Sequence, residues 1–337
     1  MFFLFTSNKK SNLASDLLPT KQKKMIKTLV AVLLLFISVP HLFGQYFNTQ
    51  RNWSMNKKEL VFGFGTTGFL GDLGGADQIG TDFSPKDYDF KSTSIGGSIG
   101  FRYRFHPYFS TTSIMNFGMI KGSDAKTNEP IRFNRNLHFR SPILNVSQRF
   151  EYIILANEKF GRRYKIPGLK GFRERNEQLY LFSGVGVLLF NPQAQYNGEW
   201  YNLHDLKTEG QGLPGGATPY KRITATIPMG IGMRMGITRY WRIGIEISYI
   251  KTFSDYIDDV HGRYYDPAIL LAQVGPESAA LSNPAMTPSW FEPGSQRGDK
   301  QLDGLIYVNF TLTKNITFKQ VGTKRLRYKQ AKLRSKF

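Results

Sequence analysis

The chain has 337 residues, a mean hydropathy of −0.33 and a formal net charge of +20 at pH 7. It contains no cysteine, which excludes disulfide bonds, thiolate metal sites and a lipidated cysteine. The positive charge favours acidic partners such as lipid headgroups, an acidic protein or nucleic acid.

The N-terminus has the pattern of a secretory signal. A short apolar run at 28–39 is preceded by four lysines and followed by Gly44. The lysines are Lys21, Lys23, Lys24 and Lys27. A charged region, an apolar region and a small residue predict a signal peptide cleaved after Gly44. We interpret residues 1–24 as an upstream extension or a long charged region; an N-terminal anchor helix is the alternative.

Apolar residues then alternate with small or polar ones, which indicates strands with one apolar face. The predicted strands span residues 59–67, 94–105, 108–120, 138–154, 179–190, 222–236, 241–251 and 303–313. The clearest pair is 222–251, where Ile231 and Met233 share one face and Gly232 and Arg234 the other. A soluble hairpin would alternate in the same way, but both strands of this pair are long enough for the roughly 9–11 residues that cross a bilayer.

The connections alternate between long and short. Residues 68–91, 121–136, 191–220 and 252–302 form long loops, whereas 106–107 and 237–240 are tight turns. This asymmetry is typical of bacterial outer-membrane barrels, with long outer loops and short periplasmic turns. We therefore predict an all-β chain: a signal segment (1–44), an eight-stranded antiparallel transmembrane β-barrel (45–313) and a basic periplasmic tail (314–337).

The polar face of the strands points into the predicted barrel. A lumen of eight strands has room only for side chains, so we expect an interior network rather than a pore, with a narrow ion path as the alternative. Arginines outnumber glutamates, so tyrosines, waters or anions are expected to complete the network. The predicted members are Arg102, Arg104, Arg149, Glu151, Arg234, Arg242 and Glu246, with Arg222 on the same face.

Catalysis has little support in the sequence. The histidines beyond the signal segment, His106, His138, His204 and His261, have no metal-binding spacing. Acidic residues lie near two of them, as in His204-Asp205 and in the run from Asp255 to His261. We interpret these acids as solvating the outer loops or binding calcium loosely, and expect no enzymatic activity, cofactor or dedicated metal site.

Two basic segments lie on the predicted periplasmic side. The connection 155–178, longer than a periplasmic turn should be, carries seven cations against three acids, and the tail carries nine cations and no acid. We predict a docking surface for an acidic periplasmic protein; a solvated tail or contact with anionic lipid are the alternatives, and nucleic acid is not expected in that compartment. The residues concerned are Arg162, Arg163, Lys165, Lys170, Arg173, Arg175, Lys324, Arg325, Arg327, Lys329, Lys332 and Arg334.

Four segments resemble a known family. FNPQAQYNGEWYNL at 190–203, KTEGQG at 207–212, IPMGIG at 227–232 and KTFSDYIDDV at 251–260 are similar to PorG-type outer-membrane barrels of the type IX secretion system. Weaker similarity runs from GTTGFLGDL at 65–73 to the last strand. The resemblance implies an outer-membrane barrel that associates with a periplasmic ring built by a lipoprotein and its partner subunit, in a machine that exports proteins and supports gliding motility. It implies no catalytic residue.

The working hypothesis is thus a non-enzymatic barrel, in contact with outer-membrane lipids, that docks the periplasmic ring of a secretion machine. A lipid-modifying barrel enzyme, which would need a histidine beside a serine or glutamate at the outer rim, is one alternative. A small channel or an adhesin-like surface barrel is another.

Overall fold

A computed structural model describes residues 53–73, 92–127, 129–158, 176–238, 240–299 and 301–317. The predicted signal peptide lies outside the described residues. So do the predicted docking residues, those of 162–175 and those of 324–334.

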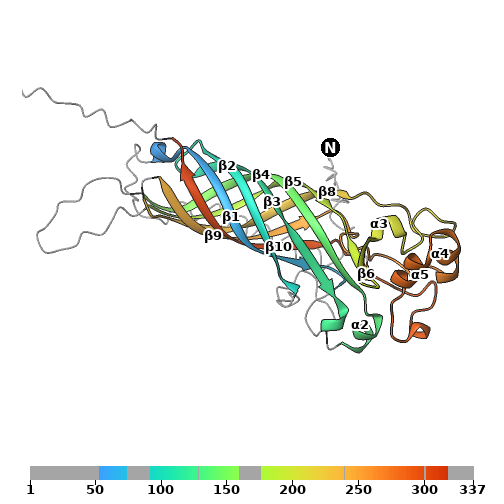
Figure 1. The fold of residues 1–337 in the computed structure, drawn as a ribbon. Helices are drawn as coiled ribbons and strands as arrows, with labels where there is room; N and C mark the ends of the chain where they lie inside the picture. Colours follow the sequence, from blue (N-terminus) through green and yellow to red (C-terminus); the bar gives the residue numbers. More distant parts are fainter. Residues whose placement is uncertain are drawn as a thin grey trace, which may run out of the picture. The chain divides into compact units, whose positions relative to one another are not determined.

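Eight long strands pair edge to edge and close on themselves. Going round the barrel, β1 is followed by β2, β3, β4, β5, β8, β9 and β10, every pair is antiparallel, and β10 pairs with β1 again. Figure 1 shows these strands wound around one axis. The predicted eight-stranded antiparallel barrel is confirmed. The strands are β1 (Lys58–Leu70), β2 (Ser94–Arg104), β3 (Phe109–Ser123), β4 (His138–Glu158), β5 (Asn176–Phe190), β8 (Ile223–Gly236), β9 (Trp241–Thr252) and β10 (Gly304–Asn315).

The two ends of the barrel differ. The turns 105–108 and 237–240 lie at one end, together with the connection from β4 to β5, and the long loops lie at the other. Short turns face the periplasm in outer-membrane barrels, so we assign the short-turn end to that side. The described parts of the long loops contain short helices and strands, several of which contact one another at the outer end (Figure 1). These elements are α2 (Pro130–Arg135), β6 (Gln193–Tyr196), β7 (Glu199–Asn202), α3 (Leu203–Leu206), α4 (Pro267–Gln273) and α5 (Pro276–Ser282).

The outward face of the barrel is apolar. Side chains such as Phe64, Ile95, Val185 and Phe310 are each more than 60% exposed. An apolar belt on every strand would be costly in water and is the surface that lipid covers. The chain is therefore a transmembrane barrel of the outer-membrane type. An aromatic girdle, the usual mark of a bilayer interface, lies at the short-turn end and includes Tyr103, Phe105, Tyr108, Phe109, Tyr152 and Tyr240.

Among the described residues, no helix is long and apolar enough to cross a bilayer.

The lumen is filled in layers. At the outer end, strand residues such as Leu188, Ile250 and Leu305 pack with Ile257 and Val260 of the last outer loop into one apolar core. Small polar side chains occupy the middle: Ser98, Asn116, Asn145, Ser147, Ser248 and Asn309. Buried arginines and glutamates fill the short-turn half, and this charged layer is the first candidate site.

Candidate functional site

One guanidinium stands at the centre of the charged layer. Arg102 of β2 places Nε 2.9 Å from both carboxylate oxygens of Glu151 on β4. Its Nη1 lies 3.3 Å from Glu59 of β1, and its Nη2 lies 3.2 Å from Glu246 of β9. All four side chains are buried. A single cation therefore connects three carboxylates that come from three other strands.

Three further arginines complete the layer. Arg234 lies 3.4 Å from Glu151, Arg242 lies 3.0 Å from Glu59, and Arg149 lies 3.1 Å from Glu246. Each glutamate thus contacts Arg102 and one other arginine. Such a buried network is stable only when every carboxylate is paired, because an unpaired charge in this environment costs several kcal/mol.

Neutral side chains add hydrogen bonds to two of the glutamates, whereas Nε and Nη2 of Arg149 have no hydrogen-bond partner among the described residues. The hydroxyl of Ser110 donates to Glu151 at 2.8 Å, and Thr112 donates to the same carboxylate. Tyr180 donates its hydroxyl to Glu246, and its ring lies 4.5 Å from the guanidinium carbon of Arg234. A tyrosine thus takes part in the network, as expected, through Glu246 and through the ring contact with Arg234.

The predicted interior residues are distributed as follows. Arg102, Arg149, Glu151, Arg234, Arg242 and Glu246 come together in the charged layer. Glu59 was missed, although the alternation that starts there places it inward with Val61. Arg104 donates instead to the backbone carbonyls of His106 and Pro107 and so braces the short turn. Placing Arg222 inward was wrong, because it is exposed in the loop before β8, where it donates to Asn191 at 3.1 Å.

The outer loops form a second polar site, which we call the outer cap. Arg135 of α2 pairs with Asp124 at 2.6 Å and donates to the backbone carbonyls of Asp72 and Arg297, both at 2.8 Å. These three partners belong to the first, second and fourth outer loops. One buried side chain therefore joins three loops that are far apart in sequence.

Arg297 connects the remaining loop. Its Nη1 lies 3.1 Å from Glu209 in the third outer loop and 2.7 Å from the backbone carbonyl of Asp259 in the fourth. The carboxylate of Glu209 also accepts the backbone N–H groups of His261 and Gly262. Together the two arginines tie all four outer loops into one unit.

Asp255, Asp258 and Asp259 are buried in the outer cap, which corrects the interpretation that they solvate the loops, whereas Asp205 is exposed as that interpretation expects. Asp258 accepts the backbone N–H groups of Leu73 at 3.2 Å and Val260 at 3.0 Å, and Asp303 accepts that of Ile257 at 2.9 Å. Asp72 accepts that of Asp299 at 2.9 Å. These carboxylates act as hydrogen-bond acceptors for backbone groups that no strand pairs.

Burial and mutual repulsion shift these carboxyls toward the protonated form. Burial, reinforced by the neighbouring Asp299 carboxylate, raises the pKa of Asp72 to about 7. Burial, together with Asp72 and Asp258, raises the pKa of Asp255 to about 9. The pKa of Asp258 also lies well above its ordinary value, mainly because the group is buried. Proton uptake by the outer cap is thus coupled to its folding.

The outer histidines are held by acids. His204 places Nδ1 3.2 Å from Asp205 and Nε2 3.1 Å from the backbone carbonyl of Tyr220, so both ring nitrogens are engaged. His261 pairs through Nδ1 with Asp255. Within the described ranges, no group of three or more His, Asp or Glu side chains is arranged to hold a metal ion.

Comparisons with known proteins return structural neighbours only. No protein-family model matches the sequence, and the search of curated proteins gives no match. The crystal structure of Ail, the attachment invasion locus protein of Yersinia pestis, in complex with a heparin analogue, matches with a TM-score of 0.32 and 8% identity over 76% of this chain and 97% of that one. Neisserial surface protein A matches with a TM-score of 0.33 and 5% identity, over 77% and 97%. OprG from Pseudomonas aeruginosa matches with a TM-score of 0.33 and 9% identity, over 77% and 96%.

Removal of the central cation is expected to destabilise the barrel. Arg102→Ala leaves Glu59, Glu151 and Glu246 with one arginine each, and breaking a buried pair costs about 3–5 kcal/mol. Denaturant unfolding in lipid vesicles, followed by tryptophan fluorescence, measures the loss. The exposed Arg222→Ala serves as the control and should change stability by less than about 1 kcal/mol. Equal effects of the two substitutions would contradict a central role for Arg102.

The outer cap should be more stable in acid than in base. The carboxyl pKa is about 3.9 in an unfolded chain, whereas Asp72 and Asp255 have values of about 7 and about 9 when folded. Between these limits the folded cap binds more protons, so its free energy of unfolding falls as pH rises from about 4 to about 9. Hydrogen exchange at Leu73 and Ile257, corrected for intrinsic rates, should lose at least about tenfold protection between pH 5 and pH 8.

The matched variants of that experiment are Asp255→Asn and Asp205→Asn. The first removes a buried titrating group and should flatten the pH dependence. The second changes an exposed carboxyl whose pKa is lowered by its hydrogen bond to His204, and should leave the dependence as it is. If protection from hydrogen exchange instead rises with pH in the wild type, the outer cap does not contain carboxyl groups with raised pKa values.

The filled lumen predicts an electrically silent barrel. The apolar core and the charged layer occupy its two ends, and an eight-stranded lumen is just wide enough for side chains. In planar bilayers the wild type should give currents indistinguishable from those of a protein-free bilayer, with a large porin as the positive control. Stepwise, ion-selective currents would instead support the channel alternative.

Proposed function

We propose that this chain is a non-enzymatic outer-membrane anchor of a type IX secretion machine, docking a periplasmic ring through its basic segments. The observation that carries the proposal is the lumen closed by buried ion pairs centred on Arg102. A barrel whose lumen is filled in this way serves as an anchor rather than as a conduit. Its partners therefore bind at the ends of the barrel.

The strand order supports the periplasmic rim as the docking side. The connection 159–175 leaves β4 after Glu158 and enters β5 at Asn176, at the same end as the two tight turns. The last described residue, Thr317, follows β10 at that end too. Both basic segments therefore start from one rim, where their charges favour an acidic partner.

The secretion-system assignment rests on the resemblance of 190–203, 207–212, 227–232 and 251–260 to PorG-type barrels. The enzyme alternative requires a histidine with a serine or glutamate at the outer rim. His204 and His261 are instead paired with Asp205 and Asp255, which gives that alternative no specific support.

Co-purification tests the proposal. A tagged chain extracted from membranes in mild detergent should recover the ring lipoprotein and its partner subunit. Reversing the charge of the tail, with Glu at Lys324, Arg325, Arg327, Lys329, Lys332 and Arg334, should lower that recovery about tenfold or more and impair secretion, since several rim contacts are lost together. A second variant reverses Arg162, Arg163 and Lys165.

The control reverses two exposed cations on the opposite side, Lys221→Glu and Arg263→Glu. It alters net charge without touching the periplasmic rim and should leave recovery unchanged. If both basic-segment variants recover the ring as well as the wild type and secretion continues, docking through these segments is wrong.

A further inference from the structure

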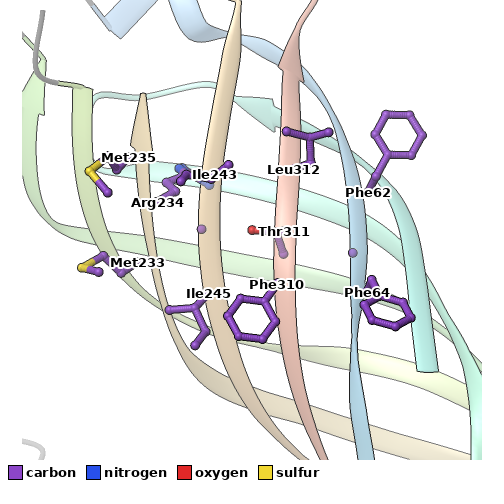
Figure 2. A pocket seen from close by; sticks show the side chains of 12 residues that line it. Phe62, Phe64, Met233, Arg234, Met235, Ile243, Ile245, Phe310, Thr311 and Leu312 are labelled. Carbon is purple, nitrogen blue, oxygen red and sulfur yellow. The ribbon is translucent and has the colours of Figure 1, made fainter. Parts of the chain in front are cut away.

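The lipid-facing wall carries an apolar groove where the first and last strands meet. It has a volume of about 570 Å³ and runs across β8, β9, β10 and β1 (Figure 2). The backbones of Gly63 and Gly244 contribute to its lining, while bulky side chains form its walls. The volume lies within the roughly 300–1,000 Å³ of small-molecule sites. Two outward rows make the walls: Met233, Ile245, Phe310 and Phe64, then Met235, Ile243, Leu312 and Phe62.

The strand register places the groove at the periplasmic side of the membrane. The next outward row toward the short turns consists of Trp241, Lys314 and Leu60, which are direct cross-strand partners. Tryptophan concentrates at the level of the lipid headgroups. The groove therefore opens toward the headgroups of the periplasmic leaflet.

Two lysines stand at this opening. Lys314 is exposed, with Nζ 5.5 Å from the ring centre of Trp241. Lys58 is also exposed, and it lies diagonally across the β1–β10 pair from Lys314, within reach of the same ligand. Glu177 lies on β5 beside Met235, three strand spacings from β10, or roughly 14 Å. Among the described outward-facing side chains at the seam, the charges are thus positive.

We propose that this groove is a binding site for an anionic diacyl phospholipid of the periplasmic leaflet. An acyl chain lies along the two apolar rows, and the phosphate meets the ammonium groups of Lys314 and Lys58. Lysine binds phosphate as a point charge and keeps its aliphatic stem against the apolar wall. The space between the two apolar rows and the paired cations together distinguish this position from ordinary lipid contact along the belt.

Native mass spectrometry of the purified full chain tests the site. The chain is titrated in detergent with phosphatidylglycerol or with phosphatidylcholine of the same acyl chains. The wild type should retain one phosphatidylglycerol molecule in preference to phosphatidylcholine. Lys58→Gln with Lys314→Gln should reduce that preference about 25-fold, or about fivefold per lysine, from roughly 1 kcal/mol for each basic side chain near a charged surface.

Two more variants separate the contribution of the groove to lipid retention from the contribution of the lysine charges. Leu312→Trp fills the groove with both lysines in place and should lower retention of both lipids. Lys121→Gln removes an exposed lysine at the outer end of β3 and should behave as the wild type. A heat-dependent shift in electrophoretic mobility confirms that each variant is folded.

Three results would overturn the proposal: equal retention of the two lipids by the wild type, unchanged retention by Leu312→Trp, or the same loss in Lys121→Gln as in the double lysine variant. The purified chain is measured without a ring, so the outcome is independent of the docking experiment.

Discussion

The ion pairs of Arg102 are the interaction on which the barrel depends. A buried guanidinium must be neutralised inside the protein, and here Glu59, Glu151 and Glu246 reach it from three other strands. A slip of one residue in any of these strands would turn its glutamate toward lipid and leave a charge unpaired. The network therefore favours one register among those that the alternating pattern alone would allow, and it closes the lumen with the same side chains.

The outer cap is also held by buried ion pairs, but there the acidic side chains outnumber the basic ones. Arg135 and Arg297 join four loops, but the acids around them exceed the cations, so Asp72 and Asp255 hold protons that an exposed carboxyl would release. The charged layer has the opposite excess, with four arginines against three glutamates. Arginines are thus in excess in the periplasmic half of the lumen, and carboxyl groups are in excess in the outer cap.

The strands were predictable because their period of two is a local property. Met233 and Arg234 are neighbours in the sequence, so their side chains point to opposite faces of the strand. The apolar residue marks the lipid face and the charged residue marks the lumen face, without knowledge of the fold. The loops were not predictable, since their helices and the β6–β7 hairpin depend on contacts between distant segments. Asp258, for example, is buried because Leu73, from another loop, donates to it. The prediction of the charged layer left out Glu59, which lies inward directly opposite Arg102 of the neighbouring strand β2. Its second partner, Arg242, comes beside it only because β10 and then β9 follow β1 around the closed barrel.

The closing seam between β1 and β10 also joins the two ends of the sequence that forms the barrel. The backbone N–H of Lys58 donates to the side chain of Thr317, so the first strand and the residue after the last strand are fixed together at one rim. These two residues are 259 positions apart in the sequence. A substitution that opens the seam at this rim would therefore release the start of the first strand and the end of the last one together.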